Sequence, residues 1–354
     1  MTGTSRAMSD AVRRGVPLSE WTTLGLGGPA DVLVEVDDVG SLSAVLAEAE
    51  AGARPVLVLG GGSNLVISDD GFPGTVVRVG IKGVNVEPDG EGALVRAGAG
   101  EDWSSLVSSC VAEGLSGIEC LSGIPGLAGG APVQNVGAYG QEVAGTIVAV
   151  TVWDRPRHCT RELAPSDCGF AYRDSVFKRG STYVVTEVCF RLQRSALSQP
   201  LRYAELARHL GCELGQGAPL QLTAQAVLDL RRSKGMVLDR SDPDTRSAGS
   251  FFTNPVLDDL QLARLRELAP DVPTFPAPPG TKVPAAWLVE RAGFAKGYRQ
   301  GGAAISTKHA LALTARQGGT TADLLALARA VRDGVHGRFG VLLEPEPVLV
   351  GAHL

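Results

Sequence analysis

The sequence lacks the features that mark several large classes of protein. Its Lys and Arg residues form no basic stripe, and a formal net charge of -5 with a pI near 5.6 gives no electrostatic footprint for nucleic acid. Residues 1–17 carry charges but no apolar segment, so we expect no signal peptide but a mobile tail, in which Met8 is an alternative start. The composition is that of a globular protein of two or three domains. We expect a cytoplasmic monomer without nucleic-acid or membrane partners.

Paired cysteines and clustered metal ligands are also missing. None of the six cysteines forms a C-x-x-C pair, and none of the five histidines lies at ligand spacing from such a pair. Reduced thiols in a cytosolic protein are therefore the better interpretation, and no metal site is expected. The cysteines are Cys110, Cys120, Cys159, Cys168, Cys189 and Cys212.

Residues 121–140 contain no charged side chain, but their six glycines and two prolines leave no apolar run long enough to span a bilayer. A long uncharged loop is usually functional or disordered, and interleaved apolar residues such as Ile124 and Val133 argue against disorder. Glycines let the main chain approach a ligand closely. We therefore expect this loop to line a flat, polar-edged ligand; a purely structural packed loop is the alternative.

A second glycine-rich segment, residues 60–64, follows an expected right-handed β-α-β unit. That unit consists of a strand at 30–36, a helix at 39–51 and a strand at 55–59. A dinucleotide fingerprint needs a third glycine and a following helix, but Leu65 occupies the glycine position and two strand-like segments follow. The simple Rossmann interpretation therefore fails. The turn is either a nest of N–H groups for a pyrophosphate or a tight turn without a ligand.

The rest of the chain predicts an α+β protein with mixed sheets. Strands are expected at 65–68, 75–79, 93–97, 146–153 and 182–192, with a helix at 101–113. From about Gly235 the sequence favours helices, and Thr320 to Asp323 has the form of a capping box. Helices at 258–268 and 284–292 and terminal strands at 340–343 and 348–350 complete this second domain.

Seven short segments stand out in this order along the chain: Thr22-Thr23-Leu24-Gly25, Pro55 to Leu65, Ile124 to Gly140, Tyr172-Arg173-Asp174-Ser175, Gly249 to Pro255, Gly301-Gly302-Ala303-Ala304 and Leu343-Glu344-Pro345-Glu346. Taken together and in this order, they resemble the UDP-N-acetylenolpyruvoylglucosamine reductase family. The resemblance implies an FAD-binding region of the type shared with vanillyl-alcohol oxidase and the cresol hydroxylase flavoprotein, followed by a C-terminal α+β substrate-binding domain. The implied boundaries are a tail at 1–17, FAD-binding subdomains at 18–84 and 85–234, a substrate domain at 235–340, and a return of 341–354 to the FAD-binding region.

The implied reaction is the NADPH-dependent reduction of UDP-N-acetylglucosamine enolpyruvate to UDP-N-acetylmuramate through FAD, in peptidoglycan precursor synthesis. Ser250 matches the proton donor to C2 of the enolpyruvyl group, although without the family pattern a turn hydroxyl is the better interpretation. Arg173 and Glu346 match the pair that polarises the substrate carboxylate, with Glu344 as the close competitor of Glu346.

Binding residues are also implied by the resemblance. Tyr203 matches the tyrosine that covers the uridine diphosphate, Lys234 and Asn254 match diphosphate contacts, and Tyr139 and His309 are assigned to substrate. The residues expected to hold FAD are Leu59, Gly60, Gly61, Gly62, Ser63, Asn64, Leu65, Ile124, Pro125, Gly126, Gly129, Gly130, Ala131, Gln134, Asn135, Gly137, Ala138 and Tyr139.

The sequence departs from the family at two places. Pro347 and Val348 follow Glu346, where the family often carries an Arg, which puts one flavin or phosphate contact in doubt. His309 stands where a relative has glutamine, and a structural histidine is an equal alternative to a substrate contact. Two other functions stay open: an FAD oxidase of the same superfamily acting on an alcohol, and a nucleotide-sugar sensor that has lost turnover.

Overall fold

The computed structural model describes residues 12–180 and 182–354, and the chain divides into two compact units. Among the described residues, unit 1 comprises 12–16, Ala30–Gly61 and Pro73–Ser233. Unit 2 comprises Pro17–Pro29, Gly62–Phe72 and Lys234–Leu354. Residues 18–29 and 62–72, which we expected in the first FAD-binding subdomain, group with unit 2. The alternative start Met8 lies outside the described residues.

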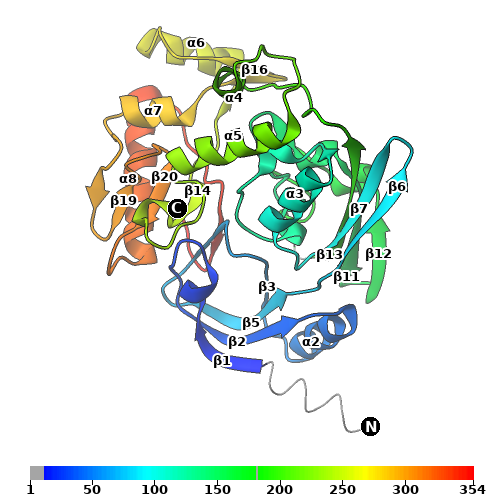
Figure 1. Ribbon diagram of the computed structural model, residues 1–354. Coiled ribbons are helices and arrows are strands. Elements are labelled where there is room, and N and C mark those ends of the chain that lie inside the picture. The colour runs from blue at the N-terminus through cyan, green and yellow to red at the C-terminus, as the bar shows by residue number, and fades with distance from the viewer. Residues whose placement is uncertain (1–11, 181) are drawn as a thin grey trace, which may run out of the picture. The chain divides into compact units, whose positions relative to one another are not determined.

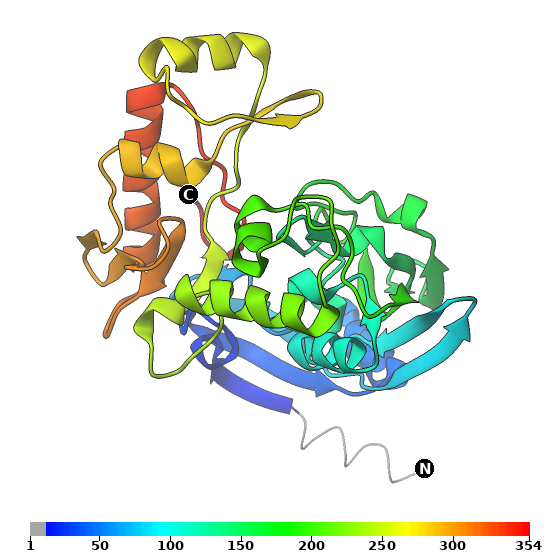
Figure 2. The same cartoon turned by 45° about the horizontal axis from the view of Figure 1, so that its top comes forward.

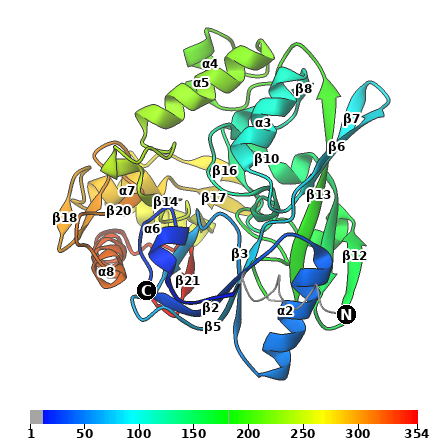
Figure 3. The same cartoon turned by 60° about the horizontal axis from the view of Figure 1, so that its bottom comes forward.

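Unit 1 begins with a four-stranded sheet in the order β1-β2-β5-β3. Its strands are β1 (Val12–Pro17), β2 (Pro29–Val36), β3 (Val56–Leu59) and β5 (Phe72–Val79). Helix α2 (Val39–Ala51) starts where the Asp38 side chain accepts the N–H of Ser41, and its buried leucines share a core with β2 and β5. Figure 3 shows α2 beside this sheet. The expected elements of the β-α-β unit are present, but β5 lies between β2 and β3 and pairs parallel with β3.

The expectation of a mobile tail is wrong for residues 12–17, because β1 forms the edge of this sheet. Its sequence VRRGVP alternates too little to be recognised as a strand.

The larger sheet of unit 1 has the order β12-β11-β13-β7-β6, with β8 pairing beside β13 (Figure 1). Trp103 of α3 packs against Phe190 of β13 with ring centroids 5.8 Å apart, and both side chains are fully buried. Helices α4 and α5 contact each other, and α5 also contacts α3. The elements are β6 (Val84–Asp89), β7 (Gly92–Gly98), α3 (Trp103–Ala112), β8 (Leu115–Ser116), β11 (Ile147–Asp154), β12 (Cys159–Leu163), β13 (Tyr183–Arg194), α4 (Ala204–Leu210) and α5 (Leu220–Ser233).

Residues 121–140, in unit 1, form a loop with little regular structure, as expected. They contain a short 3₁₀ helix, η3 (Ala128–Gly130), and the two-residue strand β9 (Gly137–Ala138), which pairs with β10 (Gln141–Glu142). The 3₁₀ helices η2 (Glu119–Leu121) and η4 (Val143–Gly145) flank the loop. Another 3₁₀ helix, η5 (Pro165–Cys168), follows β12.

Unit 2 contains an antiparallel sheet in the order β14-β20-β19-β18 and a smaller sheet in the order β15-β17-β16. Figure 2 shows helix α7 beside α8. The ring centroids of Trp287 in α7 and Phe339 in α8 lie 6.0 Å apart. The elements are η1 (Leu18–Trp21), η6 (Pro243–Thr245), β14 (Ser247–Ser250), β15 (Val256–Leu257), α6 (Asp259–Leu268), β16 (Phe275–Ala277), β17 (Gly280–Lys282), α7 (Ala285–Arg291), β18 (Arg299–Gln300), β19 (Ala303–Ile305), β20 (Ala312–Ala315) and α8 (Thr321–Phe339).

The two ends of α8 follow the sequence signals. Thr320 and Asp323 form the expected capping box, and Gly340 ends the helix with a left-handed φ of 67°. The terminal strand β21 (Val348–Val350) is confirmed and pairs parallel with β4 (Leu65–Ile67). The expected strand at 340–343 is wrong: Val341 and Leu343 are buried, but residues 341–344 join no strand in the described part of the chain.

Candidate active site

The two glycine-rich segments expected to hold the cofactor are in contact within unit 1. A Cβ on Gly61 would lie 2.6 Å from the Cα of Gly126, so only glycine permits this approach of the two main chains. Gly60 and Gly130 differ, because a Cβ on either would meet no protein atom within 4 Å. The contact therefore leaves glycine main chain facing open space on both segments.

The turn at 60–64 crosses the boundary between the two units after Gly61. In unit 2, Gly62 has a φ of 63°, and a Cβ there would lie 1.8 Å from the carbonyl oxygen of Trp21. Thr23, in one of the family-like segments, donates its N–H to Gly62 O at 3.2 Å and its hydroxyl to Ser247 O at 2.8 Å. Thr23 therefore ties the glycine turn to β14.

The loop at 121–140 contains two non-glycine residues in the left-handed region, Asn135 with φ 43° and Tyr139 with φ 49°. The Asn135 amide nitrogen donates to Glu142 and to Ala171 O, and its amide oxygen accepts the N–H of Ala144. These bonds hold the strained residue in place. Because the Asn135 side chain is committed to protein partners, any contact with a cofactor would be made by its main chain.

Arg173 is a third residue with positive φ, at 56°. It occupies the third position of a turn closed by reciprocal main-chain bonds between Ala171 and Asp174, where glycine is usual when φ is positive. Its guanidinium donates to Gly137 O at 2.6 Å and to Asn135 O at 3.4 Å. The structure thus joins this predicted catalytic side chain to the loop at 121–140.

Tyr139 and Tyr203 lie edge to face in unit 1, with ring centroids 5.2 Å apart and an interplanar angle of 83°. Burial raises the pKa of the Tyr139 phenol to about 12, although the positive charge of Arg231 opposes the shift. Burial also lowers the pKa of the Arg231 guanidinium to about 10, and Tyr139 opposes that shift in turn. The structure therefore brings together the two tyrosines assigned to substrate and adds the half-buried cation of Arg231.

Ser250 lies at the end of β14 in unit 2, directly after an irregularity in strand pairing. Ser247 pairs with Thr314 and Ser250 with Ala312, so β14 contains one extra residue, and Gly249 has a φ of 77°. A bulge of this kind redirects the side chain that follows it and is frequent beside active sites. The Ser250 hydroxyl lies 3.4 Å from Nε2 of His309.

Glu346 lies next to Ser250 in unit 2 through the main chain. Its N–H donates to the carbonyl oxygen of Phe251 at 2.9 Å, and the amide of Asn64 donates to its carbonyl oxygen at 3.4 Å. The competitor Glu344 is exposed and lies opposite Thr253, whose N–H it accepts at 3.0 Å. The residue next to Ser250 is therefore paired with Glu346 and not with Glu344.

The two residues matched to diphosphate contacts also lie in unit 2. The Asn254 amide oxygen accepts the first N–H of α7, from Ala285, which leaves its amide nitrogen as a donor. Lys234 is partly exposed, directly after the end of α5. Arg173 belongs to unit 1, whereas Ser250 and Glu346 belong to unit 2.

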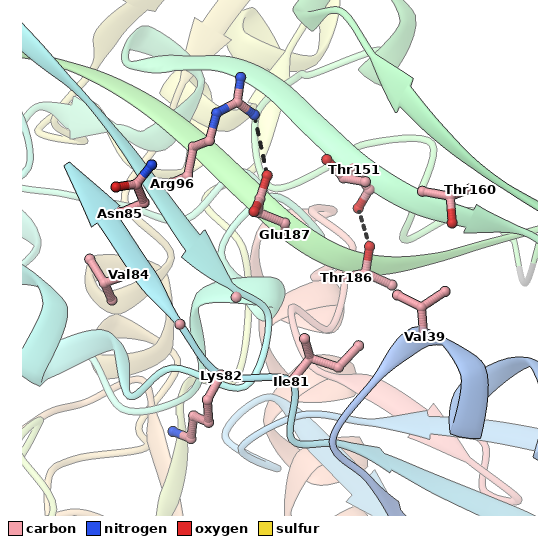
Figure 4. Close-up of a pocket in the computed structure, with 12 residues that line it drawn as sticks. Val39, Ile81, Lys82, Val84, Asn85, Arg96, Thr151, Thr160, Thr186 and Glu187 are labelled. Carbon is pink, nitrogen blue, oxygen red and sulfur yellow. Dashed lines mark hydrogen bonds and ion pairs between the residues drawn. The ribbon is translucent and has the colours of Figure 1, made fainter. Parts of the chain in front are cut away.

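A separate cavity of about 360 Å³ lies in unit 1, and none of the predicted site residues lines it. Figure 4 shows two contacts between its lining residues: Arg96 donates to Glu187 at 3.2 Å, and Thr186 donates to Thr151 O at 3.2 Å. These groups are engaged with each other, and we assign no ligand to this cavity.

The site residues suit a flavin better than a metal. No group of three or more His, Cys, Asp or Glu residues within 12–180 and 182–354 could hold a metal ion. The open main-chain faces of Gly60 and Gly130, on segments that touch, match a cofactor that accepts hydrogen bonds from main-chain N–H groups. No helix in the described part of the chain is long and apolar enough to cross a membrane.

Comparison with known families supports the same class of protein. Residues 30–156 match the model of an FAD binding domain. Residues 242–350 match the model of the UDP-N-acetylenolpyruvoylglucosamine reductase C-terminal domain. The chain is an FAD-dependent oxidoreductase, and the expected fold class, an FAD-binding domain followed by an α+β C-terminal domain, is confirmed.

Whole-length relatives specify the family. A UDP-N-acetylenolpyruvoylglucosamine reductase of Thermobifida fusca is 54% identical over 98% of this chain and 100% of its own length. One of Salinispora arenicola is 54% identical over 95% of both chains. The crystal structure of the Thermus caldophilus enzyme is 28% identical, covers 96% of this chain and 98% of its own, and has a TM-score of 0.66.

The chain belongs to the UDP-N-acetylenolpyruvoylglucosamine reductase family. The predicted function is thereby confirmed: the chain is an FAD enzyme, with NADPH as reductant, that forms UDP-N-acetylmuramate for peptidoglycan synthesis, a pathway required for cell shape and division.

Several residues that shape the site were not recognised from the sequence. Glu119 is completely buried, and its carboxylate accepts hydrogen bonds from Gly117 N, Gln141 Nε2 and Gln199 N. It therefore joins the end of the loop that carries Tyr139 to the segment that leads to Tyr203. The signal for Arg231 is its position three residues before Lys234, but only the fold shows that it is half-buried near Tyr139.

Proposed function

We propose that Ser250, Arg173 and Glu346 are the catalytic residues of the reductase reaction. Ser250 protonates C2 of the enolpyruvyl group, and Arg173 with Glu346 stabilises the negative charge that develops on the substrate carboxylate. The observation that carries this proposal is the bulge at Gly249, which presents the Ser250 hydroxyl beside His309 while the main chain of the next residue is paired with Glu346.

Each side chain suits its proposed task. A guanidinium can donate two parallel hydrogen bonds to a carboxylate, and Arg173 is held at a fixed place by its bonds to the loop at 121–140. A glutamic acid beside a substrate carboxylate is useful when it shares a proton with it. Positioned proton transfer from a group such as Ser250 contributes roughly 10²–10⁴-fold to a rate.

We also propose that the segments 59–65 and 124–139 hold FAD through their main chain. When it is bound, FAD supplies the hydride that no side chain can supply. The chain's contribution is to hold the cofactor against glycine main chain and to keep the loop rigid through Asn135 and Arg173.

For the substrate we propose that Tyr203, Tyr139, Lys234 and Asn254 bind the uridine diphosphate portion. Tyr203 is 42% exposed although its ring contacts Tyr139, which leaves it a free face for a ligand. The amide nitrogen of Asn254 and the ammonium of Lys234 are donors suited to phosphate oxygens. We further propose that the protein works as a monomer in the cytoplasm.

The two half-reactions of the FAD-loaded protein test the role of Ser250. In Ser250→Ala, NADPH should reduce the flavin at the wild-type rate under anaerobic conditions. Reoxidation by UDP-N-acetylglucosamine enolpyruvate should slow by about 10²-fold or more, because the proton donor is missing.

Equal loss in both half-reactions would refute Ser250 as the proton donor.

A further inference from the structure

The turn that joins β19 to β20 contains His309 and places it next to Ser250. Ser306, at the start of the turn, is completely buried, and its hydroxyl accepts the N–H groups of Lys308 at 3.0 Å and His309 at 3.3 Å. Pairing of Ser250 with Ala312 of β20 fixes the register of the turn against β14. Within this frame, Nε2 of His309 lies 3.4 Å from the Ser250 hydroxyl oxygen.

The second ring nitrogen determines which proton His309 carries. Nδ1 of His309 accepts the main-chain N–H of Leu311 at 3.3 Å, so its lone pair is used and it carries no proton. A neutral imidazole has one protonated nitrogen, which must then be Nε2. The hydrogen-bond network therefore assigns the Nε2–H tautomer, with Nε2 donating to the Ser250 hydroxyl oxygen.

This direction of the hydrogen bond excludes His309 as the base that takes the Ser250 proton. With this direction, His309 can instead stabilise the Ser250 oxygen after its proton has left. When the Oγ–H bond of Ser250 breaks and a C–H bond forms at C2 of the substrate, the oxygen is left with one negative charge. A donor already aimed at that oxygen stabilises the charge, as oxyanion-hole donors do, and such charge-assisted bonds shorten to about 2.7–2.9 Å.

We propose that His309 is a positioning residue that makes Ser250 a competent acid by donating Nε2–H to its developing alkoxide. Water then returns a proton to Ser250 before the next turnover, so protons balance without any change in the protonation of His309. The proposal rests on Ser250 being the proton donor, and it replaces our expectation that His309 binds substrate directly.

The other charged groups of the turn are already engaged. Lys308 Nζ bonds to Asp242 at 2.5 Å, and Asp244 accepts hydrogen bonds from Thr307 and from Arg316, the latter at 2.7 Å. These contacts fix both sides of the turn, and the imidazole of His309 is the group that faces Ser250.

Two substitutions separate the two hydrogen bonds of the imidazole. In His309→Asn, the amide oxygen can take the place of Nδ1 and accept the Leu311 N–H, but no donor reaches Ser250. In His309→Gln, the amide nitrogen can take the place of Nε2 and donate to Ser250. We expect reoxidation of the reduced flavin by the sugar nucleotide to slow by about 100-fold in His309→Asn and by less than about 10-fold in His309→Gln. Flavin reduction by NADPH serves as the internal reference.

The Ser250→Ala background tests whether His309 acts through Ser250. If it does, adding His309→Asn to Ser250→Ala should slow the reaction no further, because the two changes remove one interaction. Additive losses, or equal losses in His309→Asn and His309→Gln, would overturn the proposal. Wild-type reoxidation in Ser250→Ala itself would instead show that the proposed role of Ser250 is wrong.

A readout without turnover tests the tautomer. Nitrogen-15 NMR of the histidine-labelled full-length protein should show an Nε2–H tautomer for one of the five histidines. That signal should be missing in His309→Asn. An Nδ1–H tautomer at His309 would overturn the proposal even if the variants were slow.

Discussion

The guanidinium of Arg173 donates to the carbonyl oxygen of Gly137 at 2.6 Å, from a residue that itself has a φ of 56°. Arg173, which we propose binds substrate, thus also holds the loop at 121–140, which we propose binds the cofactor. Positive φ costs a non-glycine residue of order 1 kcal/mol or more, so the fold tolerates strain where the guanidinium is needed.

Substitutions of Arg173 should separate the cost of its positive φ from the loss of its proposed contact with the substrate carboxylate. Arg173→Gly should be as stable as Arg173→Ala or up to about 1 kcal/mol more stable, because glycine adopts positive φ without strain. Both variants, and Arg173→Lys, should lose at least about 10-fold in kcat/KM for the sugar nucleotide, since none supplies the fork. Urea unfolding and steady-state kinetics are the measurements, and full activity in Arg173→Lys would contradict the bidentate role.

Gly60→Ala should weaken FAD binding without weakening the fold. A Cβ at Gly60 meets no protein atom within 4 Å, so the urea midpoint of the apoprotein should stay at the wild-type value. The methyl group would occupy space proposed for the cofactor, and we expect the Kd for FAD, measured by fluorescence quenching, to rise at least about 10-fold.

Two glycine substitutions serve as controls for Gly60→Ala. Gly62→Ala should destabilise unit 2 severely, because its Cβ would lie 1.8 Å from Trp21 O at a positive φ. Gly337→Ala, on an exposed position of α8, should keep wild-type FAD affinity and add about 0.5–1 kcal/mol of stability. Unchanged FAD affinity in Gly60→Ala would place the cofactor elsewhere.

Buried cysteines should be labelled more slowly than exposed ones, because the thiolate is the reactive form and burial disfavours it. Burial raises the pKa of Cys110 to about 12 and that of Cys168 to about 11, and it also raises the pKa of Cys120. Iodoacetamide at pH 8 should therefore modify the partly exposed Cys159 and Cys212 first, as peptide mass spectrometry would detect. Early labelling of Cys110 would show that unit 1 opens more readily than its packing indicates.

The sequence predicted the elements better than their arrangement. The strands flanking Val39–Ala51 and the capping box of α8 follow from local periodicity, which is a property of the segment itself. The placement of β5 between β2 and β3 depends on pairing between distant segments, which no local pattern reveals. Similarly, Val341 and Leu343 alternate like a strand because they are buried, but they have no partner strand.

The site shows the same division. The glycine-rich segments and the positions of Ser250, Arg173 and Glu346 could be named from motifs. The positive φ of Arg173, the bulge before Ser250 and the direction of the His309 hydrogen bond come from tertiary contacts. They determine what these side chains can do, and a motif specifies only that they are there.

Asp244 should stabilise unit 2 in a pH-dependent way. It is 5% exposed and bonds to Thr307 N at 3.1 Å and to Arg316 at 2.7 Å. Burial by itself would raise the pKa of this carboxyl, but the hydrogen bonds from Thr307 and Arg316 outweigh it and lower the pKa below its ordinary value of 3.8. An amide cannot accept all of these hydrogen bonds. Asp244→Asn should therefore lower the free energy of unfolding by about 2 kcal/mol at pH 7.

The sign of the pH dependence follows from the lowered pKa. The stabilisation is present above pH 3.8 and is lost as the pH falls through the lower folded-state pKa, so the gap between wild type and Asp244→Asn should narrow below pH 3.8. Urea midpoints at pH 7, 5 and 3, at a fixed FAD concentration, are the measurement. Asp271→Asn is the control. The ion pair between Asp271 and Arg291 is exposed, so this substitution should lower the free energy of unfolding by less than about 1 kcal/mol. Equal midpoints for the two variants at pH 7 would mean that Asp244 does not hold the turn that carries His309.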